Sequence, residues 1–336
     1  MSRLLLALFA AAFLAAAPAS AQNVVGTPAN PAPVPPRALE LEMQQMLTGG
    51  RIAGRVTIPD ERAANLIQPA GQSWRDFHNT TLTWVGGIAI LGVLAVLALF
   101  YMTRGRIPIE GGPSGRTIER FNLLDRSVHW MTASTFVILA LSGLNLTFGR
   151  FLILPLIGPE AFATLSLWGK IAHNFLAFPF TLGIVLMFLL WAKDNIPNGR
   201  DIAWFKAGGG LIGKGAHPPP AGRFNGGQKM VFWLTVLGGA AVAVSGYILV
   251  FPFAFTDIAG QQLAHMVHGL LSVLMIAAIM AHIYIGSIGM EGAFDAMGSG
   301  QVDLNWAKEH HALWVEQEMA RGRVSAPPAG AAAAGD

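Results

Sequence analysis

Five long apolar stretches constrain the fold of this 336-residue chain more than any other feature. They cover residues 82–101, 130–148, 176–191, 230–251 and 263–286. A transmembrane helix needs about 20 largely apolar residues, and only helices or closed barrels cross a bilayer. The composition agrees, because 53% of the residues are hydrophobic and only 12% are charged. The sequence therefore predicts an all-α integral membrane protein, not an ordinary soluble one.

The N-terminus has the three regions of a secretory signal: Arg3, an apolar run over residues 4–17, and the small residues Ala19-Ser20-Ala21. We expect a signal peptide over residues 1–21. The alternative is an uncleaved sixth helix, although the apolar run is short for a span. Residues 22–80 are then an exported periplasmic arm, which either lies on a partner or on the membrane surface, or is a disordered leader. The tail, residues 317–336, is expected to be disordered.

Basic residues predict the orientation of the spans. They concentrate in two loops, 102–129 and 192–229, and are nearly absent from the other two. Because basic loops stay on the cytoplasmic side, the mature N-terminus is expected in the periplasm and the C-terminus in the cytoplasm of a bacterial inner membrane. The isoelectric point near 9.4 thus reflects topology, and we do not expect nucleic acid as a partner.

Four histidines lie in or beside the apolar stretches: His129, His173, His268 and His282. An ionisable group at membrane depth is costly and by default marks a functional site. With the predicted orientation, His129 and His282 lie at matching depth near the cytoplasmic face, and His173 and His268 near the periplasmic face. We call these the inner pair and the outer pair.

The fifth stretch supplies one histidine to each pair. Fourteen residues separate His268 from His282, which corresponds to a rise of about 21 Å and a return to within about 40° of the same helix face. His265 competes for the outer position, but it falls about 100° away from the face of His282. The spacing favours His268 and leaves His265 as the alternative.

The chemistry of the pairs favours haem b. The chain has no cysteine, which excludes iron–sulfur ligation and covalently attached haem c. Zinc needs a third or fourth ligand at each site, whereas a porphyrin supplies four and needs only two histidines from facing helices. We therefore expect two haem b groups. The alternative to a haem protein is a haem-free membrane transporter or anchor. His78 is expected to be an interfacial residue, and His310 and His311 to be solvated.

Several motifs between residues 118 and 316 resemble the gamma subunit of respiratory, membrane-bound formate dehydrogenase. They are Phe121 to Trp130 (FNLLDRSVHW), Gly169 to His173 (GKIAH), Asn195-Ile196-Pro197, Phe224 to Lys229 (FNGGQK), His282-Ile283-Tyr284, and Trp306-Ala307-Lys308 with His310-His311. The resemblance covers four of the five predicted spans. The remaining span, residues 81–102, looks like the extension of longer members.

This resemblance implies a four-helix dihaem cytochrome b domain over residues 118–316, preceded by one additional N-terminal span. The family anchors a catalytic molybdenum or tungsten subunit and an iron–sulfur beta subunit, and passes electrons to ubiquinone or menaquinone. It implies that the inner and outer pairs hold the two haem irons. It also implies a quinone site beside His282, at a turn whose polar side chains are Asn225 and Gln228. From the residues alone, this turn is a loop with Asn225 as a helix cap. A cytochrome b of a hydrogenase or another periplasmic oxidoreductase is the alternative.

Overall fold

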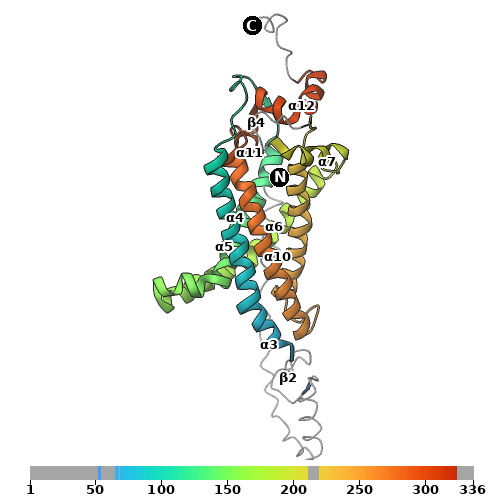
Figure 1. Ribbon diagram of the computed structural model, residues 1–336. Coiled ribbons are helices and arrows are strands. Elements are labelled where there is room, and N and C mark those ends of the chain that lie inside the picture. The colour runs from blue at the N-terminus through green and yellow to red at the C-terminus, as the bar shows by residue number, and fades with distance from the viewer. Residues whose placement is uncertain (1–51, 54–64, 68, 211–218, 324–336) are drawn as a thin grey trace, which may run out of the picture. The chain divides into compact units, whose positions relative to one another are not determined.

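The computed structural model describes residues 52–53, 65–67, 69–210 and 219–323. The predicted signal peptide, most of the exported arm and the end of the tail lie outside these residues. Five helical segments in the described part are long and apolar enough to cross a membrane. They are Gly71–Arg104, Leu123–Leu152, Leu154–Trp191, Gly226–Val250 and Ile258–Gly289. The predicted all-α membrane fold is confirmed (Figure 1).

The first span is a continuous helical run of α3 (Pro69–Asp76), the π-helical segment η1 (Phe77–Leu82) and α4 (Thr83–Arg104). The helical run begins at Pro69, before residue 81, where the membrane span itself is predicted to start. It packs along α10 (Ile258–Tyr284). Exposed apolar side chains follow its length, as a lipid-facing helix requires: Ile88, Leu91, Leu94, Val96 and Leu99.

The second and third spans, α5 (Leu123–Leu152) and α6 (Leu154–Trp191), form an antiparallel hairpin. Asn122 starts α5 through a reciprocal capping box with Asp125. Gly158 interrupts α6 with a positive φ of 78°, a conformation that glycine adopts without strain. Around the start of α6 the chain, green in Figure 1, projects away from the bundle.

The fourth span consists of α8 (Gly226–Trp233), the π segment η3 (Leu234–Gly238) and α9 (Gly239–Val250). The fifth span is α10 followed by the π segment η4 (Ile285–Gly289). Asp257 caps α10, because its carboxylate accepts a hydrogen bond of 3.0 Å from the Gly260 amide. Short π segments inside α-helices are frequent at functional sites, and η4 begins directly after the turn that carries His282.

Small elements cover the end of the bundle where α5 begins and α10 ends, and we call them the polar cap (Figure 1). They are β3 (Thr117–Glu119), α7 (Gly199–Lys206), η2 (Gly208–Gly210), α11 (Asp295–Gly298), β4 (Gln301–Asp303) and α12 (Leu304–Ala320). β3 pairs antiparallel with β4. The buried core of the polar cap includes Ile118, Val302 and Trp306. Because α12 continues to Ala320, the first residues of the predicted disordered tail are helical. A separate antiparallel pair, β1 (Ile52–Ala53) and β2 (Asn65–Ile67), precedes α3.

Candidate haem-binding histidines

The structure brings together the two rings of each predicted pair. The ring centres of His129 on α5 and His282 on α10 are 6.4 Å apart. Those of His173 on α6 and His268 on α10 are 6.1 Å apart. Two imidazoles on opposite sides of one metal ion have centres about 6 Å apart, since each metal–nitrogen bond is about 2 Å and each ring centre lies about 1 Å further away. Both pairs therefore have the spacing of bis-histidine coordination.

Hydrogen bonds fix the tautomer of the outer pair. His173 Nδ1 lies 2.8 Å from the hydroxyl of Ser142, and His268 Nδ1 lies 3.0 Å from the carbonyl oxygen of Val242. A carbonyl oxygen only accepts, so Nδ1 of His268 carries the proton. Its Nε2 then keeps a free lone pair, as a metal ligand needs.

The inner pair has a different surround. His129 Nδ1 is buried without a hydrogen-bond partner in the described part of the chain.

These donors fit haem better than a bare metal ion. Among the described residues, no group of three or more His, Cys, Asp or Glu side chains comes together. Zinc would need such a group, whereas a porphyrin completes the coordination of two imidazoles. Haem ligation by the four histidines stays a prediction that this geometry favours.

His265 does not face His173. Its ring lies 5.7 Å from the ring of Trp74, in an edge contact, and Trp74 stacks on His78 at 5.7 Å. His265 therefore contacts the first span, while His268 occupies the position opposite His173. This geometry agrees with the preference for His268 that the 14-residue spacing gave.

The turn before α8 is a capping box, which confirms Asn225 as a helix cap. The Asn225 side chain accepts from the Gln228 amide at 3.0 Å, and the Gln228 side chain accepts from the Asn225 amide at 3.2 Å. Both glycines between them lie against Trp204: a Cβ atom added to Gly227 would be 2.6 Å from its ring. The side-chain carbonyl oxygens of Asn225 and Gln228 already accept hydrogen bonds from the backbone. Their side-chain NH₂ groups are therefore the donors that this turn can offer a ligand.

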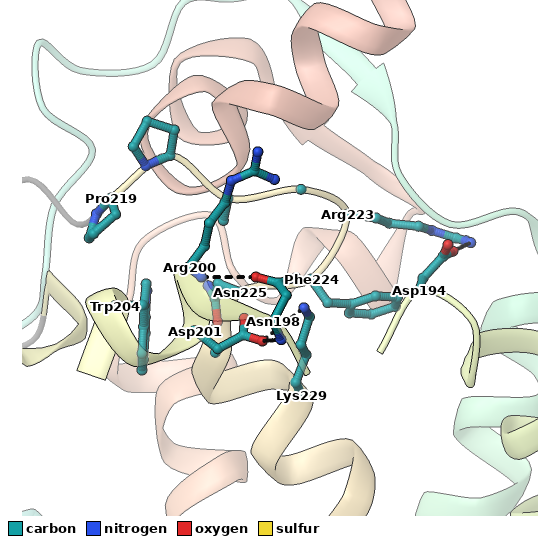
Figure 2. Close-up of a pocket in the computed structure, with 14 residues that line it drawn as sticks. Asp194, Asn198, Arg200, Asp201, Trp204, Pro219, Arg223, Phe224, Asn225 and Lys229 are labelled. Carbon is teal, nitrogen blue, oxygen red and sulfur yellow. Dashed lines mark hydrogen bonds and ion pairs between the residues drawn. The ribbon is translucent and has the colours of Figure 1, made fainter. Parts of the chain in front are cut away.

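A cavity of about 100 Å³ borders this turn (Figure 2). Asn225, Trp204 and Arg200 line it, together with a buried ion pair in which Lys229 Nζ lies 3.0 Å from Asp201 Oδ2. Lys229 also donates to the carbonyl of Ile196 at 3.0 Å. The lysine is thus satisfied, and it anchors α8 to α7 and to the chain before it.

Sequence patterns did not reveal the centre of the polar cap. Arg120 is buried there with its guanidinium carbon 5.1–5.6 Å from the rings of Phe121, Trp306 and Trp314. Burial, and next the charge of Arg223, lower the pKa of Arg120 to about 9. The arginine still carries its charge at neutral pH and is stabilised by cation–π contacts.

The prediction that His310 and His311 are solvated is wrong for His311, which is fully buried. Its Nδ1 donates to the carbonyl of Gly222 at 2.9 Å, which ties α12 to the segment before α8. Burial, followed by the charge of Arg120, lowers the pKa of His310 to about 4 and also lowers that of His311.

Comparison with known proteins connects this geometry to a family. The family model described as prokaryotic cytochrome b561 matches residues 120–300, which contain both histidine pairs. The chain belongs to this family. Membership implies haem b as cofactor, and it leaves the first span outside the matched region.

Individual relatives agree. The chain is 32% identical over 205 residues to the formate dehydrogenase cytochrome b556(fdo) subunit of Escherichia coli strain K12, covering 60% of this chain and 93% of the relative. It is 28% identical over 206 residues to the nitrate-inducible formate dehydrogenase cytochrome b556(Fdn) subunit of the same strain, covering 60% and 92%. A formate dehydrogenase cytochrome b556 subunit of Haemophilus influenzae is 27% identical over 198 residues, covering 58% and 80%. The resemblance predicted from the motifs is confirmed.

Proposed function

We propose that this chain is the membrane cytochrome b subunit of a formate dehydrogenase complex and conducts electrons through two b haems to quinone. The observation that carries the proposal is the presence of two facing histidine pairs, with ring centres 6.4 Å and 6.1 Å apart. Each pair takes one of its histidines from α10. The names of the relatives support formate dehydrogenase as the complex.

Each element of the bundle has a role in this proposal. Haem b supplies one-electron transfer when it is bound. His129 on α5 and His173 on α6 would each hold one haem, together with His282 and His268 on α10. Because His268 and His282 lie on one continuous helix, the helix rise of about 21 Å fixes the separation of the two sites along the bundle.

The direction of electron flow follows from the expected topology. Basic residues concentrate at the polar cap and its flanking loops, which supports a cytoplasmic position for the cap and the inner pair. Electrons from the iron–sulfur beta subunit, which receives them from the molybdenum or tungsten subunit, would then enter at the outer pair. Each charge that crosses the membrane is worth about 2.3 kcal/mol per 100 mV.

Quinone reduction is proposed near the inner pair, at the turn that begins α8. The side-chain NH₂ groups of Asn225 and Gln228 remain available after the capping box has used their carbonyl oxygens. Hydrogen-bond donors suit the carbonyl oxygens of a quinone. Gln228 also lies 3.4 Å from the guanidinium of Arg120, whose positive charge favours the anionic states of a reduced quinone.

The test is the electron donor of the native complex. The chain is purified from its own membranes with the subunits that remain attached, and the haem absorption is recorded after addition of formate or of hydrogen. Reduction of the haems by formate and not by hydrogen supports the proposal. Reduction by hydrogen alone would assign the chain to a hydrogenase, and absence of haem would support a transporter or anchor instead.

A further inference from the structure

Each histidine of the outer pair contacts a Ser-Gly dipeptide on a neighbouring helix. Ser142-Gly143 lies on α5 and faces His173, and Ser245-Gly246 lies on α9 and faces His268. Both serines are buried, at 8% and 5% exposure, so water does not compete for their hydroxyl groups.

Ser142 acts as an acceptor for His173. Its hydroxyl lies 2.7 Å from the Ile138 carbonyl and 3.0 Å from the Leu139 carbonyl, so its proton points back along its own helix. The oxygen then offers a lone pair to His173 Nδ1 at 2.8 Å. This arrangement makes His173 a donor at Nδ1 and leaves its Nε2 unprotonated.

Ser245 repeats the arrangement for His268. Its hydroxyl donates to the Ala241 carbonyl at 2.8 Å, and its oxygen lies 3.2 Å from His268 Nδ1. The same Nδ1 lies 3.0 Å from the Val242 carbonyl, so two acceptors share the proton of this ring.

The glycine after Ser245 lets the imidazole of His268 approach the helix backbone closely. A Cβ atom on Gly246 would be 3.1 Å from His268 Cε1, which is tighter than an ordinary contact. A Cβ atom on Gly143 would be 3.6 Å from His173 Cε1, which is an ordinary contact. The fit is therefore closer on the α9 side.

His129 of the inner pair lacks this support, since its Nδ1 is buried without a hydrogen-bond partner in the described residues. A hydrogen bond from Nδ1 raises the basicity of the ligating nitrogen, and a more basic ligand stabilises the oxidised iron. The two pairs thus differ in the one property that serine acceptors control.

We infer that Ser142 and Ser245 are positioning residues that lower the reduction potential of the outer haem below that of the inner haem. The inference rests on the proposed function, because it needs a haem at each pair. It makes electron transfer from the outer to the inner haem favourable, as a conduit toward quinone requires.

The test is a potentiometric titration of haem absorption in the purified wild-type complex and in its Ser142→Ala and Ser245→Ala variants. We expect two components in the wild type. In Ser142→Ala the lower component should rise by on the order of tenfold in its reduction equilibrium constant, 59 mV for a one-electron couple, while the upper one stays unchanged. Ser245→Ala should raise it by less, because the Val242 carbonyl still accepts from His268 Nδ1 at 3.0 Å. Ser142→Thr and Ser245→Thr keep a hydroxyl and should restore the wild-type value. Ser134→Ala, at an exposed serine of α5, is the matched control.

A lower component that does not move in either variant, with both haems retained, would overturn the inference, as would a shift of the upper component. If one alanine variant loses its haem, the other variant decides by the same criterion. Electrodes set the potential in this titration, so the result is independent of the electron donor. Failure of formate to reduce the haems would therefore contradict the proposed function without touching the role of the serines.

Discussion

Leu82 of the first span packs against Gly269, the residue that follows the outer histidine His268. A Cβ atom on Gly269 would lie 2.8 Å from Leu82 Cδ2, and the Leu82 side chain is only 4% exposed. Small residues let membrane helices approach closely, so this contact docks the additional span onto the helix that carries a histidine of each pair.

Gly269→Ala is expected to weaken this docking. Overpacking a close contact costs about 1–3 kcal/mol, because Leu82 or the first span has to move. Thermal unfolding of the detergent-solubilised complex measures the loss. Gly87→Ala on α4 is the control, since nothing lies within 4 Å of its Cβ position. Equal stability of the two variants would show that the contact does not hold the span.

Single histidine substitutions should remove one haem each. His282→Ala is expected to lower the haem content from two to one per chain and to abolish quinone reduction, because the inner iron loses a ligand. His268→Ala should remove the outer haem instead. His265→Ala should keep both, since its ring contacts Trp74. Haem extraction against protein concentration measures each ratio, and loss of a haem in the His265 variant would refute the assignment.

Gly227→Ala should disturb the turn before α8. The added Cβ atom would meet Trp204 at 2.6 Å, so the turn or the ring must shift. We expect slower quinone reduction or a higher KM for quinone, while formate still reduces the haems. Gly199→Ala on α7, with nothing within 4 Å, is the matched control. Unchanged quinone kinetics in the Gly227 variant would argue against a quinone site at this turn.

Acid should destabilise the polar cap. The pKa of His310 falls from 6.5 to about 4 through burial and the charge of Arg120. Between these values the unfolded cap binds a proton that the folded cap does not, so stability is fully present above pH 6.5 and declines as the pH falls toward 4. Each unit of difference between the folded and unfolded pKa contributes at most about 1.4 kcal/mol to the free energy of unfolding. Hydrogen exchange of α12 against pH measures the decline, and His310→Gln should flatten it; an identical slope in the variant would contradict this cause.

The spans and the histidine pairs could be predicted because both depend on regular geometry. Apolar length identifies a span, and 14 residues of helix bring His268 and His282 to nearly one face. The Asn225 cap followed from local chemistry alone.

Other features depend on contacts between distant segments. The burial of Arg120 and His311 arises where α12 meets the chain before α8, which no local pattern reveals. The contacts of Ser142 and Ser245 with the outer histidines could not be predicted, because a serine in a membrane helix usually bonds only to its own backbone. Gly158 ends the first part of α6 through a positive φ that glycine permits but does not require.

The central claim is that each histidine pair holds one haem. The most direct test is a reduced-minus-oxidised absorption spectrum of the purified wild-type chain, combined with a haem assay calibrated against protein concentration. The account predicts two haems of the b type per chain, with both irons ligated by two histidines. One haem or none per chain would contradict it.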